Sequence, residues 1–147
     1  MRTRLRRIRI DGRTFVWRAV IHCVPGSGDC HRGIRVRVWG DGKTSQKLEV
    51  DLLSITGPSP WGACATDGSY PTPVDVRAVI SYALENGWQP ERRGGTFVLS
   101  EREHGARFSL PGFLLADPVR TAESADPTAQ VARAYEAQQQ DRRPAGC

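Results

Sequence analysis

The residues best suited to metal binding lie in two adjacent pairs, His22-Cys23 and Cys30-His31, on either side of a turn rich in Pro and Gly. If the flanking segments form a hairpin, the four side chains gather at its mouth, and zinc is bound by thiolate and imidazole groups of this kind. Neighbouring residues on a strand point to opposite faces, so no more than two of the four share one site. The six residues between Cys23 and Cys30 also exceed the roughly two to four of a zinc knuckle. We therefore expect no bound metal.

Nucleophilic catalysis needs a Cys or Ser beside an imidazole that a third group orients. The same four residues are the candidates, and no motif supplies the third group. Gly26-Ser27-Gly28 lacks the lysine and the following helix of a phosphate-binding loop. Glu101 to His104 combines two carboxylates with a histidine, in a run typical of a solvated turn. We expect a non-catalytic protein without a cofactor, and a thiol- or metal-dependent enzyme is the lesser alternative.

Arginine and tryptophan, which are frequent at interaction hot spots, alternate along the segment from residue 33 to 40 and project from one face of a predicted strand. A long segment rich in Pro, Gly and Ser, Gly57–Pro71, adds two aromatic residues. Loops of this length are uncommon unless they bind something or are disordered. We therefore predict a surface that binds another protein, as an accessory subunit or a neutralising partner. Its residues are Arg35, Arg37, Trp39, Trp61 and Tyr70.

The basic composition leaves a nucleic-acid-binding module as the alternative function. The chain of 147 residues has 21 Lys and Arg against 16 Asp and Glu, a net charge of +5, and cations bind phosphates. Only Lys43 and Lys47 are lysines, so 21 − 2 leaves 19 arginines, an excess typical of a GC-rich bacterial genome. The acidic residues are spread along the chain, which weakens any field of a single sign. The cations of this alternative are Arg2, Arg4, Arg6 and Arg7 at the N-terminus, with Arg35 and Arg37.

Alternation of apolar and polar residues predicts five strands. Asp11-Gly12, a strong hairpin signal, separates the first two. The predicted strands are Leu5–Ile10, Thr14–Val24, Gly33–Gly40, Ser45–Ile55 and Thr96–Ser100.

The turn at Asp41-Gly42 should set the register of the third and fourth strands. A three-residue loop that includes Lys43 pairs Val36 with Leu48 and sets Arg35 across from Glu49. A shift by one residue would turn every side chain to the other face. We therefore predict this three-residue loop and register.

One helix, Val74–Asn86, has the clearest pattern. Thr72 is a good N-cap, and Pro73 fits the first helical position. Asn86-Gly87 ends the helix. A single apolar stripe, spaced i, i+3, i+4, i+7 and i+8, faces the core. It consists of Val76, Val79, Ile80, Ala83 and Leu84.

The helix and its exit carry a resemblance. Pro73-x-x-Val76-x-x-Val79-Ile80-x-x-Ala83-Leu84-x-x-Gly87-Trp88-x-Pro90, with the earlier Phe15-x-Trp17-Arg18, resembles a set of short uncharacterised bacterial α+β proteins. The resemblance covers roughly Ile8 to Leu99 and implies no activity, cofactor or active site.

The whole pattern predicts an α+β fold, an antiparallel β-meander of about five strands packed against one amphipathic helix. Residues 1–115 form the predicted domain. Residues 116–147 form a flexible or marginally helical tail that we expect to be peripheral, because Val131 and Tyr135 are nearly its only apolar residues in the helical segment. The basic N-terminus precedes no apolar stretch typical of a signal peptide, and no apolar run of membrane-spanning length occurs. We expect a cytoplasmic protein whose cysteines are thiols, and its oligomeric state is left open.

Overall fold

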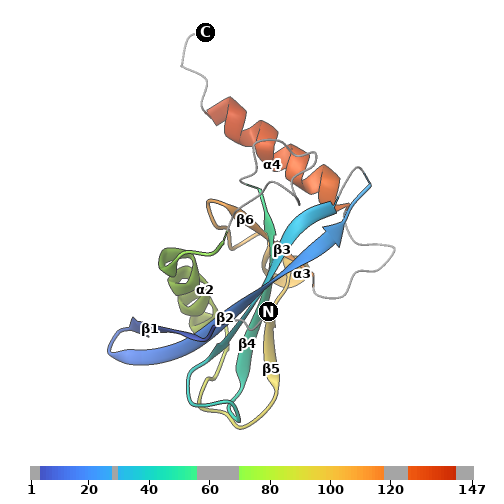
Figure 1. The fold of residues 1–147 in the computed structure, drawn as a ribbon. Coiled ribbons are helices and arrows are strands. Elements are labelled where there is room, and N and C mark those ends of the chain that lie inside the picture. The colour runs from blue at the N-terminus through green and yellow to red at the C-terminus, as the bar shows by residue number, and fades with distance from the viewer. Residues whose placement is uncertain (1–3, 28–29, 56–69, 118–125, 142–147) are drawn as a thin grey trace.

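The computed structural model describes residues 4–27, 30–55, 70–117 and 126–141, and it confirms the α+β class with a six-stranded sheet and three helices (Figure 1). The strands are β1 (Arg6–Ile10), β2 (Arg13–Pro25), β3 (Cys30–Trp39), β4 (Lys47–Ser54), β5 (Thr96–Leu99) and β6 (Phe113–Ala116). The helices are α2 (Pro73–Glu85), α3 (Glu101–His104) and α4 (Pro127–Asp141).

Strands β1 to β4 form the predicted antiparallel meander, in chain order. The fifth strand differs from a meander because β5 runs parallel to β4. A parallel neighbour needs a crossover connection, and α2 lies within this one. β6 pairs antiparallel with the second half of β4, so β5 and β6 share one edge of that strand.

The first hairpin turns where the sequence predicts. Asp11 and Gly12 have φ angles of 50° and 78°, and Ile10 pairs with Arg13 across them. Two successive residues with positive φ are the requirement of a type I′ turn, which Asp-Gly meets at little cost. The local sequence therefore determines this hairpin.

The predicted register of β3 and β4 is wrong by two residues. Val36 lies opposite Val50, and Arg35 lies opposite Asp51. The connection is longer than three residues because Gln46 N–H donates to the carbonyl of Arg92, at 2.6 Å, in the segment that follows α2. A slip of two residues keeps every side chain on its predicted face, so the core is unaffected while the polar partners change.

Helix α2 packs on one face of the sheet through the predicted stripe. Val76, Val79, Ile80 and Ala83 are buried in the main core cluster, and Leu84 lies at its margin. Its N-terminus has a capping box. Thr72 Oγ1 accepts from the Asp75 N–H at 3.3 Å, and the Asp75 carboxylate accepts from the Thr72 N–H at 2.9 Å. The capping and the stripe therefore agree on the start and the orientation of this helix.

Trp88 continues that core beyond the helix. It is buried, its ring lies 5.7 Å from that of Phe15, and its indole N–H donates to the Gln46 carbonyl at 3.0 Å. Gly87, with φ of 110°, turns the chain so that Trp88 folds back onto the last turn, as predicted.

Helix α4 is docked on the sheet, in a segment for which the sequence predicts a flexible or marginally helical, peripheral tail. Val131 is buried in a second core cluster on the other face from α2, and Thr128 Oγ1 lies 2.8 Å from His31 Nε2. Asp126, at the helix start, accepts hydrogen bonds from the hydroxyl and the backbone N–H of Ser27, and these bonds lower the pKa of its carboxyl group. The boundary predicted at residue 115 falls inside β6. The second cluster comprises Val24, Leu53, Ile55, Ala116 and Val131.

We predict that Ile80→Asp unfolds the domain. Ile80 is completely buried beneath α2, and an unpaired charge is not tolerated there. Val74→Asp is the matched control, because Val74 lies on the same helix and is 73% exposed. Thermal unfolding followed by circular dichroism should show a folded control and no cooperative transition for Ile80→Asp. Similar melting temperatures for the two variants would contradict this packing.

We predict that a chain ending at Asp117 folds but is less stable than the full chain. It loses the buried Val131, a contribution of about 1.5–3 kcal/mol, and the Thr128–His31 contact, about 0.5–1.5 kcal/mol. Urea titration should therefore show a free energy of unfolding lower by about 2–4.5 kcal/mol. Arg133→Ala in the full chain is the control, because Arg133 is exposed on α4, and it should match the full chain. Equal stability of all three chains would show that docking of α4 contributes nothing.

Candidate functional site

The candidate site lies on the face of the sheet opposite α2, which we call the outer face. Strand alternation and the observed register place the polar half of β1, β2, β3 and β4 there. Helix α4 contacts this face at the Val24 and Leu53 end, and no other described helix is packed on it. Its side chains are Arg7, Arg9, Val16, Arg18, Val20, His22, Arg35, Arg37, Trp39, Glu49 and Asp51.

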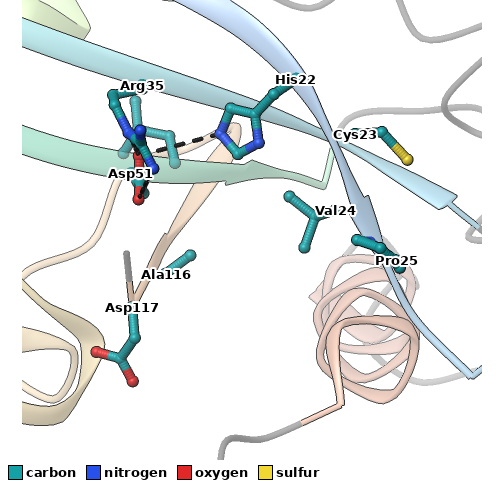
Figure 2. A pocket seen from close by; sticks show the side chains of 9 residues that line it. His22, Cys23, Val24, Pro25, Arg35, Asp51, Ala116 and Asp117 are labelled. Atoms are coloured by element: carbon teal, nitrogen blue, oxygen red, sulfur yellow. Dashed lines mark hydrogen bonds and ion pairs between the residues drawn. The ribbon is translucent and has the colours of Figure 1, made fainter. Parts of the chain in front are cut away.

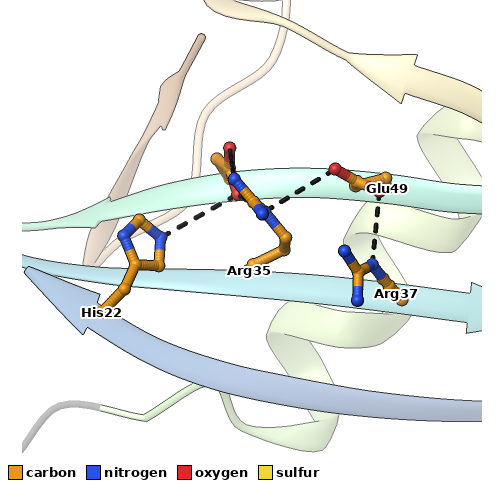
Figure 3. A network of polar contacts seen from close by, with 5 residues as sticks. His22, Arg35, Arg37 and Glu49 are labelled. Carbon is orange, nitrogen blue, oxygen red and sulfur yellow. Dashed lines mark hydrogen bonds and ion pairs between the residues drawn. The ribbon is translucent and has the colours of Figure 1, made fainter. Parts of the chain in front are cut away.

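A network of ion pairs crosses the middle of the outer face (Figure 3). Arg35 binds the Asp51 carboxylate with two nitrogens, Nε at 2.9 Å and Nη2 at 3.3 Å. Arg37 Nε donates to Glu49 at 3.3 Å, and Arg35 Nε lies 3.6 Å from the same carboxylate. The hydrogen bond from Arg35 to Asp51 and the charge of that carboxylate raise the pKa of the guanidinium. Both predicted binding arginines therefore have acidic partners within the fold.

The burial of Asp51 is the reason that the fold needs this network of ion pairs. Its side chain is only 4% exposed, against 15% for Glu49, and a buried carboxylate is costly unless it is paired and hydrogen-bonded. Arg35 supplies both requirements. We infer that Arg35 has a structural role, which reduces its availability for a partner.

Trp39 lies at the other end of the face, beside a cation for which the described residues provide no acidic partner. The Arg18 guanidinium carbon is 5.8 Å from the centre of the Trp39 ring, within the range of a cation–π contact. Arg18 Nε is buried and has no hydrogen-bond partner among the described residues. Across the strands, Arg18 faces Arg37, which is already bound to Glu49. Positive charge is therefore in excess around Trp39.

A hollow of about 360 Å³ opens at this end of the face. Leu5, Val16 and Trp39 form its apolar part, and Arg7 and Lys43 supply cations. Leu5 is 44% exposed, and none of the described residues that line the hollow is Asp or Glu. The arrangement is that of a small apolar pocket with a positive rim, suited to an apolar group next to an anion.

The structure separates the other predicted binding residues. Tyr70 packs at the margin of the main core, with its ring centre 6.4 Å from that of Trp17, so it lies with the α2 face and away from Trp39. Arg6 lies over the same two rings, at 5.6 Å from Trp17 and 5.2 Å from Tyr70. The structure therefore does not bring Tyr70 beside Trp39, because its ring packs against the core. Trp61 and Arg2 lie outside the described residues, and Arg4 is exposed next to β1.

A second, smaller pocket of about 170 Å³ lies at the α4 end of the face (Figure 2). His22 Nε2 is 4.0 Å from Asp51 Oδ1, and no described residue is within hydrogen-bond distance of this buried nitrogen. A histidine beside a carboxylate could act as a base, and the described residues that line the pocket include no Ser or Thr to act as a nucleophile. Figure 2 shows Cys23 pointing away from His22, and Cys23 is disulfide-bonded.

The disulfide at Cys23 corrects the expectation that the cysteines are thiols. The side chains of Cys30, Cys64 and Cys147 lie outside the described part of the structure. His31 is buried and contacts Thr128. Within the described ranges, no three His, Cys, Asp or Glu side chains come close enough to hold a metal ion, and the absence of zinc stays a prediction.

Comparisons with protein-family models, with curated proteins and with solved structures found no match. The resemblance to short bacterial proteins therefore stays an expectation, and the site is argued from its own geometry.

Sequence reasoning identified Trp39 but missed most of its surroundings. Arg18 and Val16 alternate on the second strand as predicted, yet only the observed register brings them beside Trp39. Leu5 and Lys43 come from the ends of other elements. The sequence contains one usable signal, an arginine on the second strand with no acidic residue opposite it. The correct pairing of β2 with β3 would have placed this residue, Arg18, beside Trp39.

We predict unequal couplings within the network. A double-mutant cycle with Arg35→Ala and Asp51→Ala should give a coupling of about 1–2 kcal/mol in the free energy of unfolding, because Asp51 is buried and bound twice. The cycle with Arg37→Ala and Glu49→Ala should give about 0.2–1 kcal/mol, as for an exposed pair. Urea denaturation of the single and double variants measures both. Equal couplings would contradict the role assigned to Asp51.

Proposed function

We propose that this chain is a non-catalytic binding protein whose Trp39 hollow takes an apolar side chain within an acidic segment of another protein. An accessory subunit or a neutralising partner would act in this way. The observation that supports the proposal best is the hollow itself, in which Leu5, Val16 and Trp39 lie beside two cations, with no carboxylate among its described lining residues. Buried aromatic anchors with a polar rim supply most of the energy of protein interfaces.

The charge around the hollow favours an acidic partner. Arg7 and Lys43 line it, and Arg18 Nε has no acceptor among the described residues. A carboxylate from a partner would pair with the Arg7 and Lys43 side chains at the rim and form charge-assisted hydrogen bonds. The Glu49 and Asp51 carboxylates are occupied by Arg37 and Arg35, so they compete little for Arg18.

A protein partner is favoured over nucleic acid by the distribution of aromatic residues. Single-stranded nucleic acid is held by successive bases stacked on successive aromatic rings. Trp39 is the one aromatic side chain that the described strands place on the outer face. Glu49 and Asp51 also interrupt the row of arginines that phosphates would need. Binding of nucleic acid through Arg4, Arg6 and Arg7 is the alternative that the experiment must separate.

The proposal includes a location, the cytoplasm of a bacterium. No helix within the described ranges is long and apolar enough to cross a membrane. The disulfide at Cys23 is a feature that persists mainly in oxidising compartments. Counting free thiols in protein prepared from its host without reductant would therefore decide this point.

The test is a selection from a displayed random-peptide library on the purified protein. We predict that selected peptides contain one large apolar residue flanked by Asp or Glu. In fluorescence anisotropy, Trp39→Ala and Arg18→Glu should each weaken the best peptide about tenfold or more, which corresponds to about 1.4 kcal/mol. Arg133→Glu is the control for the change of net charge, since it is exposed on α4, and it should bind normally.

Two results would overturn the proposal. One is the selection of peptides without an acidic preference, or peptides that bind both variants normally. The other is tight binding of a single-stranded oligonucleotide that weakens steeply with salt and is lost in Arg18→Glu. Thermal melting of each variant close to that of the wild type would confirm that lost binding does not reflect unfolding.

A further inference from the structure

One half of β2 has a strand on one side only. β2 runs from Arg13 to Pro25, whereas β1 pairs only with Arg13 to Trp17. Beyond Trp17, the described part of the chain provides β2 with a partner strand only on its β3 side. Figure 1 shows β2 continuing well past β1. Such an edge presents backbone donors and acceptors to which another strand can bind.

β1 and the open part of β2, which form this side of the sheet, differ in how well they are protected against pairing with another strand. β1 carries exposed arginines at Arg6, Arg7 and Arg9, and charged side chains on an edge strand oppose pairing with other chains. The open part of β2 begins at Arg18, its one charged residue, and the rest of it, from Ala19 to Pro25, contains no Lys, Arg, Asp or Glu. Only its two ends, Arg18 and Pro25, carry residues that oppose pairing, so the edge between them is open to a further strand.

Exposed apolar side chains lie on the same edge. Val20 is 37% exposed and Ile21 is 48% exposed, on opposite faces of the strand. With Leu5 they are three of the four large apolar residues that are exposed within the described ranges, the fourth being Val74. Both are β-branched, which favours cross-strand packing in a sheet. A strand added here would therefore cover apolar surface on both faces.

We propose that this edge joins two copies of the chain by antiparallel pairing of their β2 strands. The absence of charge favours a second copy of this chain as the strand that binds here. Two copies of a segment without charged residues meet without repulsion, and a segment rich in β-branched residues is a good partner for itself. A contact of this kind is isologous, the same patch on both copies. Its two-fold axis is perpendicular to the sheet, so both Trp39 hollows lie on one side of the joined sheet.

The contact is expected to be weak. The seven residues from Ala19 to Pro25 span about 24 Å at roughly 3.4 Å per residue, enough for an ordinary strand pair. An edge pairing of this length lies at the small end of specific interfaces, below about 1,200 Å². The dimer should therefore form in a concentration-dependent way.

Sedimentation equilibrium of the full chain, prepared without reductant to keep its disulfide, tests the proposal. The wild-type mass should rise from one chain to two chains as concentration increases from micromolar to millimolar. Val20→Lys with Ile21→Lys should remain at one chain throughout, because the introduced charges meet each other across the edge. Val74→Lys, an equally conservative change at a residue that is 73% exposed on α2, should dimerise like the wild type. Circular dichroism checks that each variant is folded. If the double variant is unfolded, the single variant Ile21→Lys replaces it in the same measurement.

Hydrogen exchange identifies the surface. Amides from Ala19 to Val24 should exchange more slowly at high than at low concentration in the wild type, and amides of α2 should not change. A monomer at every concentration would overturn the proposal, and so would a dimer that persists in the folded lysine variant. Unchanged exchange in this strand of a dimer would also overturn it. Trp39→Ala should dimerise normally, which separates a failure here from a failure of the proposed function.

Discussion

The enclosure of β4 is the constraint on which the rest of the structure depends. β3 pairs with one edge, and β5 and β6 divide the other. Val50 and Leu52 face the α2 core, whereas Leu53 faces the second cluster with Val131. A strand enclosed on two faces and two edges leaves no room for an unpaired polar group. Asp51, which lies within this stretch, must therefore have a cation, and β3 supplies it in Arg35.

This requirement organises the outer face. Asp51 and Glu49 occupy Arg35 and Arg37, so charge is balanced near α4. At the far end, Arg18 lies beside Trp39, and no carboxylate of the described part of the chain pairs with it. The face is thus divided into a part whose charges are balanced by ion pairs within the fold and a cationic part next to an apolar hollow. The candidate partner-binding site therefore lies away from Arg35 and Arg37, the arginines whose alternation along β3 is clearest in the sequence.

The two proposed surfaces are independent but geometrically related. The hollow lies on the face of the sheet, and the open edge lies along β2, so occupation of one leaves the other accessible. A two-fold axis perpendicular to the sheet would place two hollows on the same side. A partner with two acidic segments could then bind both, and its apparent affinity would exceed that of a single segment. Weak self-association would in this way strengthen weak recognition.

Local sequence determined the elements that depend only on neighbouring residues. The Asp11-Gly12 turn, the caps of α2 and the face of each strand follow from allowed φ angles and from periods of 2 and 3.6. Only the tertiary structure decided which residues and elements contact one another. The β3–β4 register depends on Gln46 bonding to the segment after α2, Tyr70 completes the core beside Trp17, and α4 docks because distant apolar residues meet Val131. Alternation specifies which face a side chain occupies, but a shift of two residues preserves that face, so no local pattern could place Arg18 beside Trp39.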